Sequence, residues 1–252
     1  MKRTLFALTI GAMLLTLHGI PAGANTEASA SYNPARWSPL APYIMQDGLT
    51  GPSTITAIDE KGAETEKAVL KYDQRGRLVE EIFYDASGSN KGKSVYEYEA
   101  GRPITQKLYN NKGELISSEV REYYQDRLKS IAYMDEKGER ALLHSFKYSP
   151  GQITGVEVSS DTRDAIAIEL NGRNITQVMF TASTGETLAN ISFKYDKTGK
   201  LVERLRSTPS GTERCRHIYN AKGQLSEYIY EIKSGDSWIL SRKLKLSYPE
   251  SA

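Results

Sequence analysis

Residues 71–81, KYDQRGRLVEE, crowd one aspartate, two arginines and two glutamates around a single glycine. Such a group of charges is either a site or the surroundings of a tight turn. Asp73 can occupy the first position of a type I turn, and Gly76 can supply the positive φ of the bulge that closes a β-hairpin. This geometry predicts that Tyr72 faces Leu78 across two strands. Because each residue type has a structural role in a hairpin, we interpret the stretch as a turn.

The same pattern recurs along the chain, for example as YNNKGEL (109–115), YDKTGKL (195–201) and YNAKGQL (219–225). A second series of turns lies between the copies, so each period holds two strands and two turns. The flanking segments are rich in Tyr, Val and Ile and often alternate between apolar and polar residues, which is typical of half-buried strands. The sequence therefore predicts an all-β protein, an antiparallel meander of repeated β-hairpins with roughly 14 to 16 strands. The anchors of the period are Tyr72, Tyr98, Tyr124, Tyr148, Leu170, Tyr195 and Tyr219.

The turns depend on an Asp or Asn that bonds its own backbone and on a Gly three residues later that accepts a positive φ. A calcium loop is the alternative for Asp-x-x-Gly, but the alternating oxygen ligands and the closing Glu are missing. We therefore assign a structural role to Asp73, Gly76, Asp85, Gly88, Asn110, Gly113, Asp135, Gly138, Asp196, Gly199, Asn220 and Gly223.

The pattern Tyr-Asp-x-x-Gly-Arg-Leu is complete at residues 72–78 and nearly complete at 195–201. It resembles the YD repeat of RHS-type bacterial surface and toxin proteins, over about residues 55–248. The resemblance implies hairpins wound into a curved sheet or shell, and an exported protein. No recognisable effector domain follows the repeats, so a role in toxin delivery is not implied.

One face of the first hairpin is richer in apolar residues, which favours a long curved or rolled sheet whose richer face lines a core or groove. A single layer that is wet on both faces is the alternative. A closed outer-membrane barrel requires an outward apolar band on every strand, which segments such as GTERCRHIY (211–219) do not provide. The residues expected to share the richer face are Leu70, Tyr72, Leu78, Ile82 and Tyr84.

The chain divides into three parts by composition. Residues 1–24 have a basic start, a short apolar run and a small-residue cleavage signal, which predicts a signal peptide and export to the periplasm or cell surface. Residues 25–54 are rich in Pro, Ser and Ala and predict an extended arm that covers a sheet edge or face. Residues 55–252 form the repeat domain, with no integral membrane span expected after cleavage.

Charge argues against nucleic acid as a partner. The chain has 33 Lys and Arg against 31 Asp and Glu, and residues 1–24 contain two of the bases and none of the acids. The rest of the chain is therefore balanced, 31 against 31, and lacks the positive footprint that nucleic-acid binding requires.

Catalytic and metal motifs are missing from the sequence. Cys215 is the single cysteine, so no intramolecular disulfide can form. Cys215 and His217 share a strand face and could be nucleophile and base, but no third orienting residue is identifiable. The better interpretation is a core cysteine beside a half-buried histidine. We predict no enzyme, no metal and no cofactor.

Exposed aromatic residues often carry recognition energy, and cross-strand packing is their alternative role. The leading functional hypothesis is a non-enzymatic binding or scaffolding module for an envelope protein or glycan. The alternative is a periplasmic carrier or chaperone-like protein whose curled sheet shelters an apolar ligand. The sequence does not define the oligomeric state. The candidate binding residues are Tyr96, Tyr98, Tyr123, Tyr124, Tyr228 and Tyr230.

Overall fold

The computed structural model describes residues 51–172 and 174–249 of the chain. The predicted signal peptide (1–24) and residues 25–50 of the predicted arm lie outside the described residues. The all-β meander is confirmed, with a strand number at the upper end of the expected range. The strands are β1 (Thr54–Asp59), β2 (Glu64–Tyr72), β3 (Leu78–Asp85), β4 (Asn90–Glu99), β5 (Arg102–Asn110), β6 (Leu115–Tyr124), β7 (Arg127–Met134), β8 (Arg140–Ser149), β9 (Gln152–Val158), β10 (Arg163–Asn171), β11 (Asn174–Thr181), β12 (Thr187–Tyr195), β13 (Leu201–Thr208), β14 (Gly211–Tyr219), β15 (Leu225–Ser234) and β16 (Ser237–Ser247).

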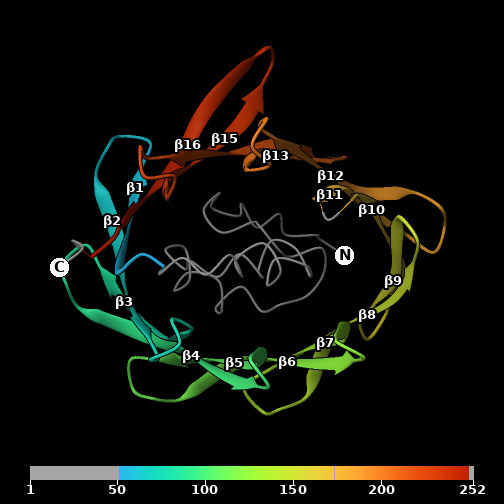
Figure 1. The fold of residues 1–252 in the computed structure, drawn as a ribbon, viewed down its shortest axis with the longest axis horizontal. Helices are drawn as coiled ribbons and strands as arrows, with labels where there is room; N and C mark the ends of the chain where they lie inside the picture. Colours follow the sequence, from blue (N-terminus) through green and yellow to red (C-terminus); the bar gives the residue numbers. More distant parts are fainter. Residues whose placement is uncertain (1–50, 173, 250–252) are drawn as a thin grey trace, which may run out of the picture.

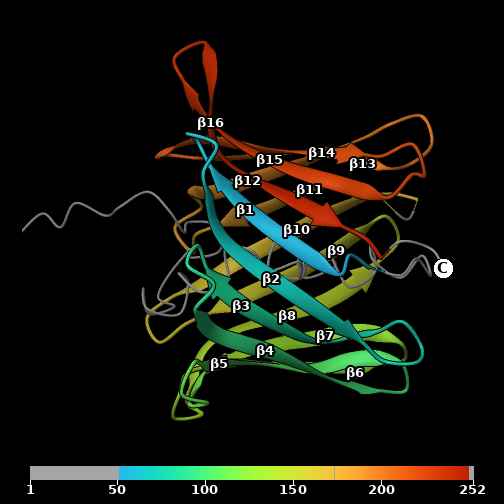
Figure 2. The ribbon, with the colours of Figure 1, turned by 90° about the vertical axis from the view of Figure 1, so that its left-hand side faces the viewer.

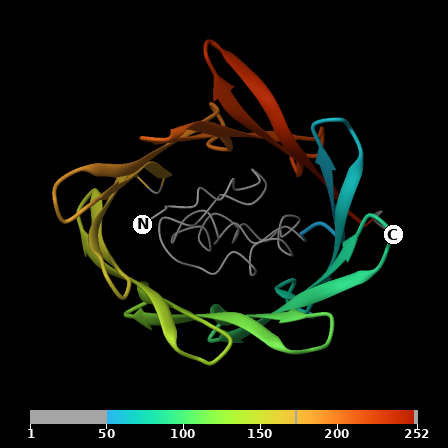
Figure 3. The same ribbon diagram turned by 180° about the vertical axis from the view of Figure 1, so that it is seen from behind.

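The sheet closes on itself. Every strand pairs antiparallel with its neighbours in sequence, and β1 also pairs with β16, from Thr54 opposite Ser247 to Asp59 opposite Arg242. The result is a closed barrel whose wall forms a ring in end views from both sides (Figures 1 and 3). From the side, the strands cross the wall at a slant (Figure 2), as closure of a twisted sheet requires.

The prediction of a long curved or rolled sheet was therefore wrong, because the sheet closes into a barrel. An even number of antiparallel strands leaves the last strand running opposite to the first, so the two edges can pair. That pairing removes two rows of unsatisfied backbone groups. An outward apolar band is a requirement for contact with lipid and is not a requirement for closure.

The turns have the hydrogen bonds of an Asx-stabilised hairpin. In the β2–β3 turn, the Gly76 backbone N–H donates to the Asp73 carbonyl (3.0 Å), while Asp73 Oδ1 accepts from the N–H groups of Arg75 and Arg77 (2.9 Å each). The φ of Gly76 is +75°, where a Cβ would be strained. The same backbone pattern occurs at Asp85 and Gly88, Asn110 and Gly113, Asp135 and Gly138, Asp196 and Gly199, and Asn220 and Gly223.

Register next to the turns agrees with the sequence pattern. Tyr72 lies opposite Leu78, as predicted. A register shift follows immediately, because Lys71 pairs with Glu80 and leaves Val79 as an extra residue. This bulge reverses the alternation of side chains along β3.

The bulge corrects the predicted face of the first hairpin. Leu70 lies opposite Glu81, both on the buried face, while Ile82 lies opposite half-buried Val69 on the other face. Ile82 and Tyr84 were therefore assigned to the wrong face, since Tyr84 lies opposite exposed Lys67. The reason is the inserted residue, which breaks the strict alternation of side chains along the strand. Glu81 is 0% exposed and accepts a hydrogen bond from the Tyr96 hydroxyl.

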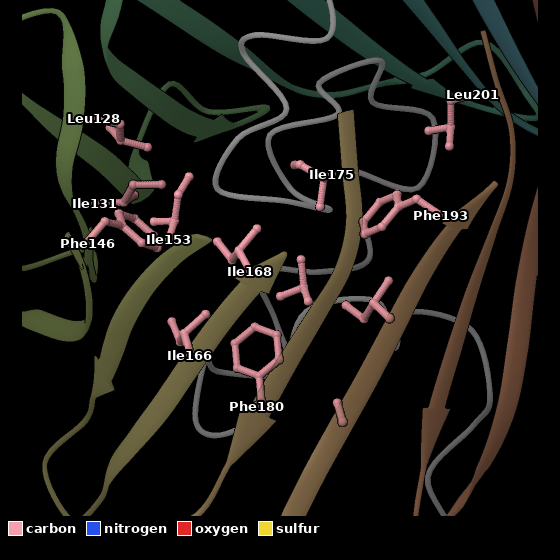
Figure 4. Packing of buried hydrophobic residues seen from close by; sticks show 13 residues of the cluster. Leu128, Ile131, Phe146, Ile153, Ile166, Ile168, Ile175, Phe180, Phe193 and Leu201 are labelled. Atoms are coloured by element: carbon pink, nitrogen blue, oxygen red, sulfur yellow. The ribbon is translucent and has the colours of Figure 1, made fainter. Parts of the chain in front are cut away.

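The inner face of the wall carries the buried apolar side chains. Alternate residues along each strand are buried although Figures 1 and 3 show no second layer of sheet outside the ring, so the buried face is the inside. Ile166, Ile168 and Phe180 project from the same side of neighbouring strands (Figure 4). One cluster, here called the β7–β13 cluster, contains Leu128, Ile131, Phe146, Ile153, Ile166, Ile168, Ile175, Val178, Phe180, Ala189, Ile191, Phe193 and Leu201. The other, the β14–β5 cluster, contains Ile55, Ala57, Ala68, Leu70, Phe83, Leu108, Cys215, Tyr228, Tyr230, Leu244 and Leu246.

A row of tyrosine hydroxyls connects strand pairs at one rim of the barrel. Each tyrosine lies at or next to the end of an even-numbered strand and donates to a backbone carbonyl within two residues of the start of the preceding strand. The pairs are Tyr72 to Pro52 (2.8 Å), Tyr98 to Leu78 (2.7 Å), Tyr123 to Pro103 (3.0 Å), Tyr148 to Leu128 (2.8 Å), Tyr195 to Ile175 (2.8 Å), Tyr219 to Leu201 (2.9 Å) and Tyr248 to Leu225 (2.9 Å).

These hydrogen bonds explain the spacing of the sequence anchors. On β10 the anchor is Leu170, which has no hydroxyl to donate. On β6 the sequence pattern pointed to Tyr124, but the structure places Tyr123 in the row. Tyr123 stands two residues before the turn at Gln125 and Asp126 (φ 46° and 66°), just as Tyr98 stands two residues before the turn at Ala100 and Gly101 (φ 48° and 83°).

We predict that Tyr195→Phe lowers the free energy of unfolding by about 1 kcal/mol, because the Ile175 carbonyl loses its hydroxyl partner. Tyr124→Phe is the matched control, since Tyr124 is 67% exposed and outside the row, and it should change stability by less than about 0.5 kcal/mol. Urea unfolding of both variants provides the measurement. Equal losses at the two positions would show that the rim hydrogen bond does not stabilise the barrel.

Candidate functional site

The candidate tyrosines do not gather on one exposed surface. Tyr96, Tyr228 and Tyr230 are buried on the inner face, with exposures of 7%, 3% and 5%. Tyr98 and Tyr123 belong to the rim row, and the guanidinium groups of Arg77 and Arg102 lie 4.8 and 5.5 Å from their ring centroids. Tyr124 alone among the six is exposed. Their shared role as a binding surface stays a prediction.

Polar residues also occur on the inner face at β3–β6. The Tyr96 hydroxyl donates to Glu81, and Gln106 Nε2 donates to the Tyr96 hydroxyl (3.2 Å) and to Ser94 Oγ (3.4 Å). Arg121, 4% exposed, donates through Nη2 to Glu119 (2.6 Å). Most polar atoms of this network have hydrogen-bond partners within it, so we assign it a role in stabilising the fold.

A second polar group lies inside the wall on three consecutive strands. His144 on β8 faces Glu157 on β9, and Glu157 faces Asp164 on β10. Each side chain belongs to a residue that is 3% exposed. His144 Nε2 lies 2.7 Å from Glu157 Oε2, while His144 Nδ1, Glu157 Oε1 and Asp164 Oδ2 have no hydrogen-bond partner. We call these three residues the inner acidic site.

Sequence reasoning missed the inner acidic site, although it leaves a signal. His144 keeps the phase of the apolar Leu142 and Phe146, and Asp164 keeps the phase of Ile166 and Ile168. A charged residue in the apolar phase of a strand therefore marks a buried polar position. That the three residues of the inner acidic site lie side by side depends on the register of β8, β9 and β10, which the sequence alone does not define.

Cys215 and His217 share the inner face, as the strand period predicted. Burial raises the pKa of the Cys215 thiol to about 11, so the thiol stays protonated near neutral pH. Burial and the Arg204 guanidinium lower the pKa of His217 to about 3 and keep the ring neutral. The His217 ring lies edge-on to the Tyr228 ring, with 4.8 Å between the ring centroids. The buried Cys215 thiol is a poor nucleophile because its pKa is raised.

Within the described part of the chain, no group of three or more His, Cys, Asp and Glu side chains could hold a metal ion.

The outer face of the wall is charged. Glu80 on β3 accepts hydrogen bonds from Lys71 on β2 (2.6 Å) and Lys93 on β4 (3.1 Å). Glu231 on β15 accepts from Arg214 Nε (2.7 Å) and Arg216 Nε (2.8 Å) on β14. Further ion pairs join Lys107 to Glu97, Lys129 to Glu122 and Lys243 to Glu227.

In residues 51–172 and 174–249, no helix is long and apolar enough to cross a membrane.

No protein-family model and no curated protein matches the sequence. Similar solved structures include a porin-like protein from Bacteroides uniformis, with 10% identity, 79% of this chain and 98% of that chain covered, and a TM-score of 0.43. A porin-like protein from Bacteroides vulgatus has 11% identity, coverage of 81% and 100%, and a TM-score of 0.40. The TcdB2–TccC3–Cdc42 structure has 15% identity, coverage of 70% and 13%, and a TM-score of 0.30. Similarity this low assigns no function to the chain.

The resemblance to YD-repeat proteins of the RHS type is wrong for this chain. In the described part of the chain the strands close into a barrel of sixteen strands, whereas the resemblance implied hairpins wound into a curved sheet or shell. The Tyr-Asp-x-x-Gly pattern instead reports a local hairpin with a rim tyrosine. Such a hairpin occurs in any meander that uses this turn, whatever the overall architecture.

Cys215 should react with iodoacetamide at pH 8 at least about 100-fold more slowly in the folded protein than in urea. The reason is burial, which excludes the reagent and suppresses the thiolate by the rise in pKa from 9.0 to about 11. Mass spectrometry of timed samples measures the two rates. Comparable rates in both conditions would show that the Cys215 side chain is accessible. That result would contradict its burial on the inner face of β14.

Proposed function

We propose that the chain is a non-enzymatic, exported β-barrel that carries an apolar ligand against the inner face of its wall. The observation behind the proposal is the distribution of side chains, apolar inside and charged outside. This proposal develops the carrier hypothesis, and export rests on the signal-like segment at residues 1–24.

The outer face does not suit lipid. On β2 only Val69 lies between outward Lys67 and Lys71, and on β4 only Val95 lies between Lys93 and Glu97. Four residues of strand span about 13 Å, whereas a transmembrane barrel needs an outward apolar band of about 25 Å. Lysine facing the bilayer midplane costs about 2 to 4 kcal/mol per residue. These charges support a barrel surrounded by water.

The inner face suits an apolar ligand. Eight strands enclose just enough room for the wall's own side chains, and sixteen enclose more. The β7–β13 cluster covers this face over seven strands. Burying apolar surface contributes roughly 25 cal/mol per Å², so whatever contacts this cluster gains most when it is itself apolar.

A binding or scaffolding module for an envelope protein or glycan is the second candidate. The tip of the β15–β16 hairpin extends beyond the rest of the wall (Figure 2). Ile239 there is 55% exposed, and the Arg214 guanidinium lies 4.2 Å from the ring centroid of Trp238. An exposed Ile beside a half-buried Trp and Arg is a combination found at recognition surfaces.

The folded protein should bind the neutral apolar dye diphenylhexatriene, seen as a rise in its fluorescence. Ile168→Thr should weaken the dye about five-fold, because a hydroxyl replaces a methyl on the inner face. Ile229→Thr is the matched control and should leave affinity unchanged, since Ile229 lies between outward Glu227 and Glu231. Circular dichroism verifies the fold of each variant.

Two results would contradict the carrier function. One is the absence of dye binding by the wild-type protein. The other is an equal loss in the Ile168 and Ile229 variants, which would place the dye outside the barrel. Specific capture of an envelope protein or glycan, lost in Ile239→Ser, would favour the second candidate.

A further inference from the structure

We infer that the ligand is a cationic amphiphile, whose ammonium group binds the inner acidic site and whose hydrocarbon tail packs on the β7–β13 cluster. This inference rests on the proposed carrier function and adds the chemical class of the ligand. It is carried by three unpaired polar atoms on residues that are more than nine-tenths buried.

The unpaired atoms define what the site lacks. Glu157 Oε1 and Asp164 Oδ2 are acceptors, and both are without a donor. A buried carboxylate oxygen without a hydrogen bond is costly, and more so when the group is charged. An ammonium group has three donors and no acceptor, so it matches two carboxylate oxygens and still has one donor to spare.

The charge of the surroundings agrees with a cation. The inner acidic site contains two carboxyl groups and one imidazole, and one nitrogen of that imidazole already contacts Glu157. The nearest inward base along the register is Arg121, which lies two strands from His144 across Ile131. Arg121 is itself paired with Glu119 at 2.6 Å. A cationic head group therefore suits the two carboxyl groups better than an anionic one does.

Apolar residues on the same strands continue the site. Phe146 follows His144 on β8, and its ring centroid lies 6.3 Å from that of the histidine. Ile166 and Ile168 follow Asp164 on the inner face of β10, at 1% and 0% exposure. The polar group thus borders the apolar cluster without a gap, which is the arrangement that an amphiphile with a head and a tail requires.

Three probes with the same twelve-carbon tail test the inference by displacing diphenylhexatriene from the folded protein. Dodecylamine should displace the dye at a concentration at least ten-fold lower than dodecanol, and dodecanoate should be the weakest. The double variant Glu157→Gln, Asp164→Asn should remove the preference for the amine while dodecanol binds as before. Glu169→Gln, an exposed outward position on β10, is the matched control and should keep the preference.

The outcomes separate this inference from the carrier function. Dye binding with equal displacement by amine and alcohol overturns the inference alone, and so does an amine preference that survives in the double variant. Absence of dye binding overturns both proposals. Where the double variant fails the circular dichroism control, Asp164→Asn alone should weaken dodecylamine at least three-fold relative to dodecanol, and an unchanged ratio overturns the inference.

Discussion

The pairing of β1 with β16 is the constraint on which the rest of the structure depends. Before closure, a two-faced sheet of this composition would expose its apolar face or require a partner to cover it. Closure turns one face into an inside and the other into an outside, and it removes both sheet edges at once. The burial of Ile55 and Leu246 on the closing strands, at 0% and 6% exposure, follows from this pairing.

The sequence repeat corresponds to the hairpins that build the barrel wall. Seven of the described hairpins use an Asp or Asn turn with a glycine. Every even-numbered strand except β10 has a tyrosine at or next to its end that donates to a carbonyl near the start of the strand before it. Because every link is local, the same short motif can be reused around the ring with little dependence on the total number of strands. Closure is then decided by how many copies are present and by how strongly the sheet curls.

The turns and their register could be predicted from the sequence, because both depend on residues close together in the chain. Tyr72 opposite Leu78 follows from one Asp and one Gly. Closure could not be predicted in this way, since it depends on the summed twist and coiling of all strands. The inward position of Glu81 was missed because a bulge reversed the alternation, and the inner acidic site was missed because three strands had to be in register.

The proposal that this barrel stands in water rests on the distribution of charge. A barrel in a membrane presents apolar side chains outward and can be polar inside, whereas here Lys71, Glu80 and Lys93 form an ion-pair chain on the outer face. The β7–β13 cluster lies on the inside instead. The closed fold and the inverted distribution together support a carrier in water.

One measurement tests closure in water most directly. Thr56 and Lys245 are register partners across the β1–β16 seam, and directly opposed Cα atoms in antiparallel strands lie within disulfide reach. The double variant Thr56→Cys, Lys245→Cys should form an intramolecular disulfide on mild oxidation in buffer without detergent, as a monomer seen by mass spectrometry. A protein that cross-links only in detergent, or that does not cross-link although it is folded, would contradict a closed barrel that stands in water.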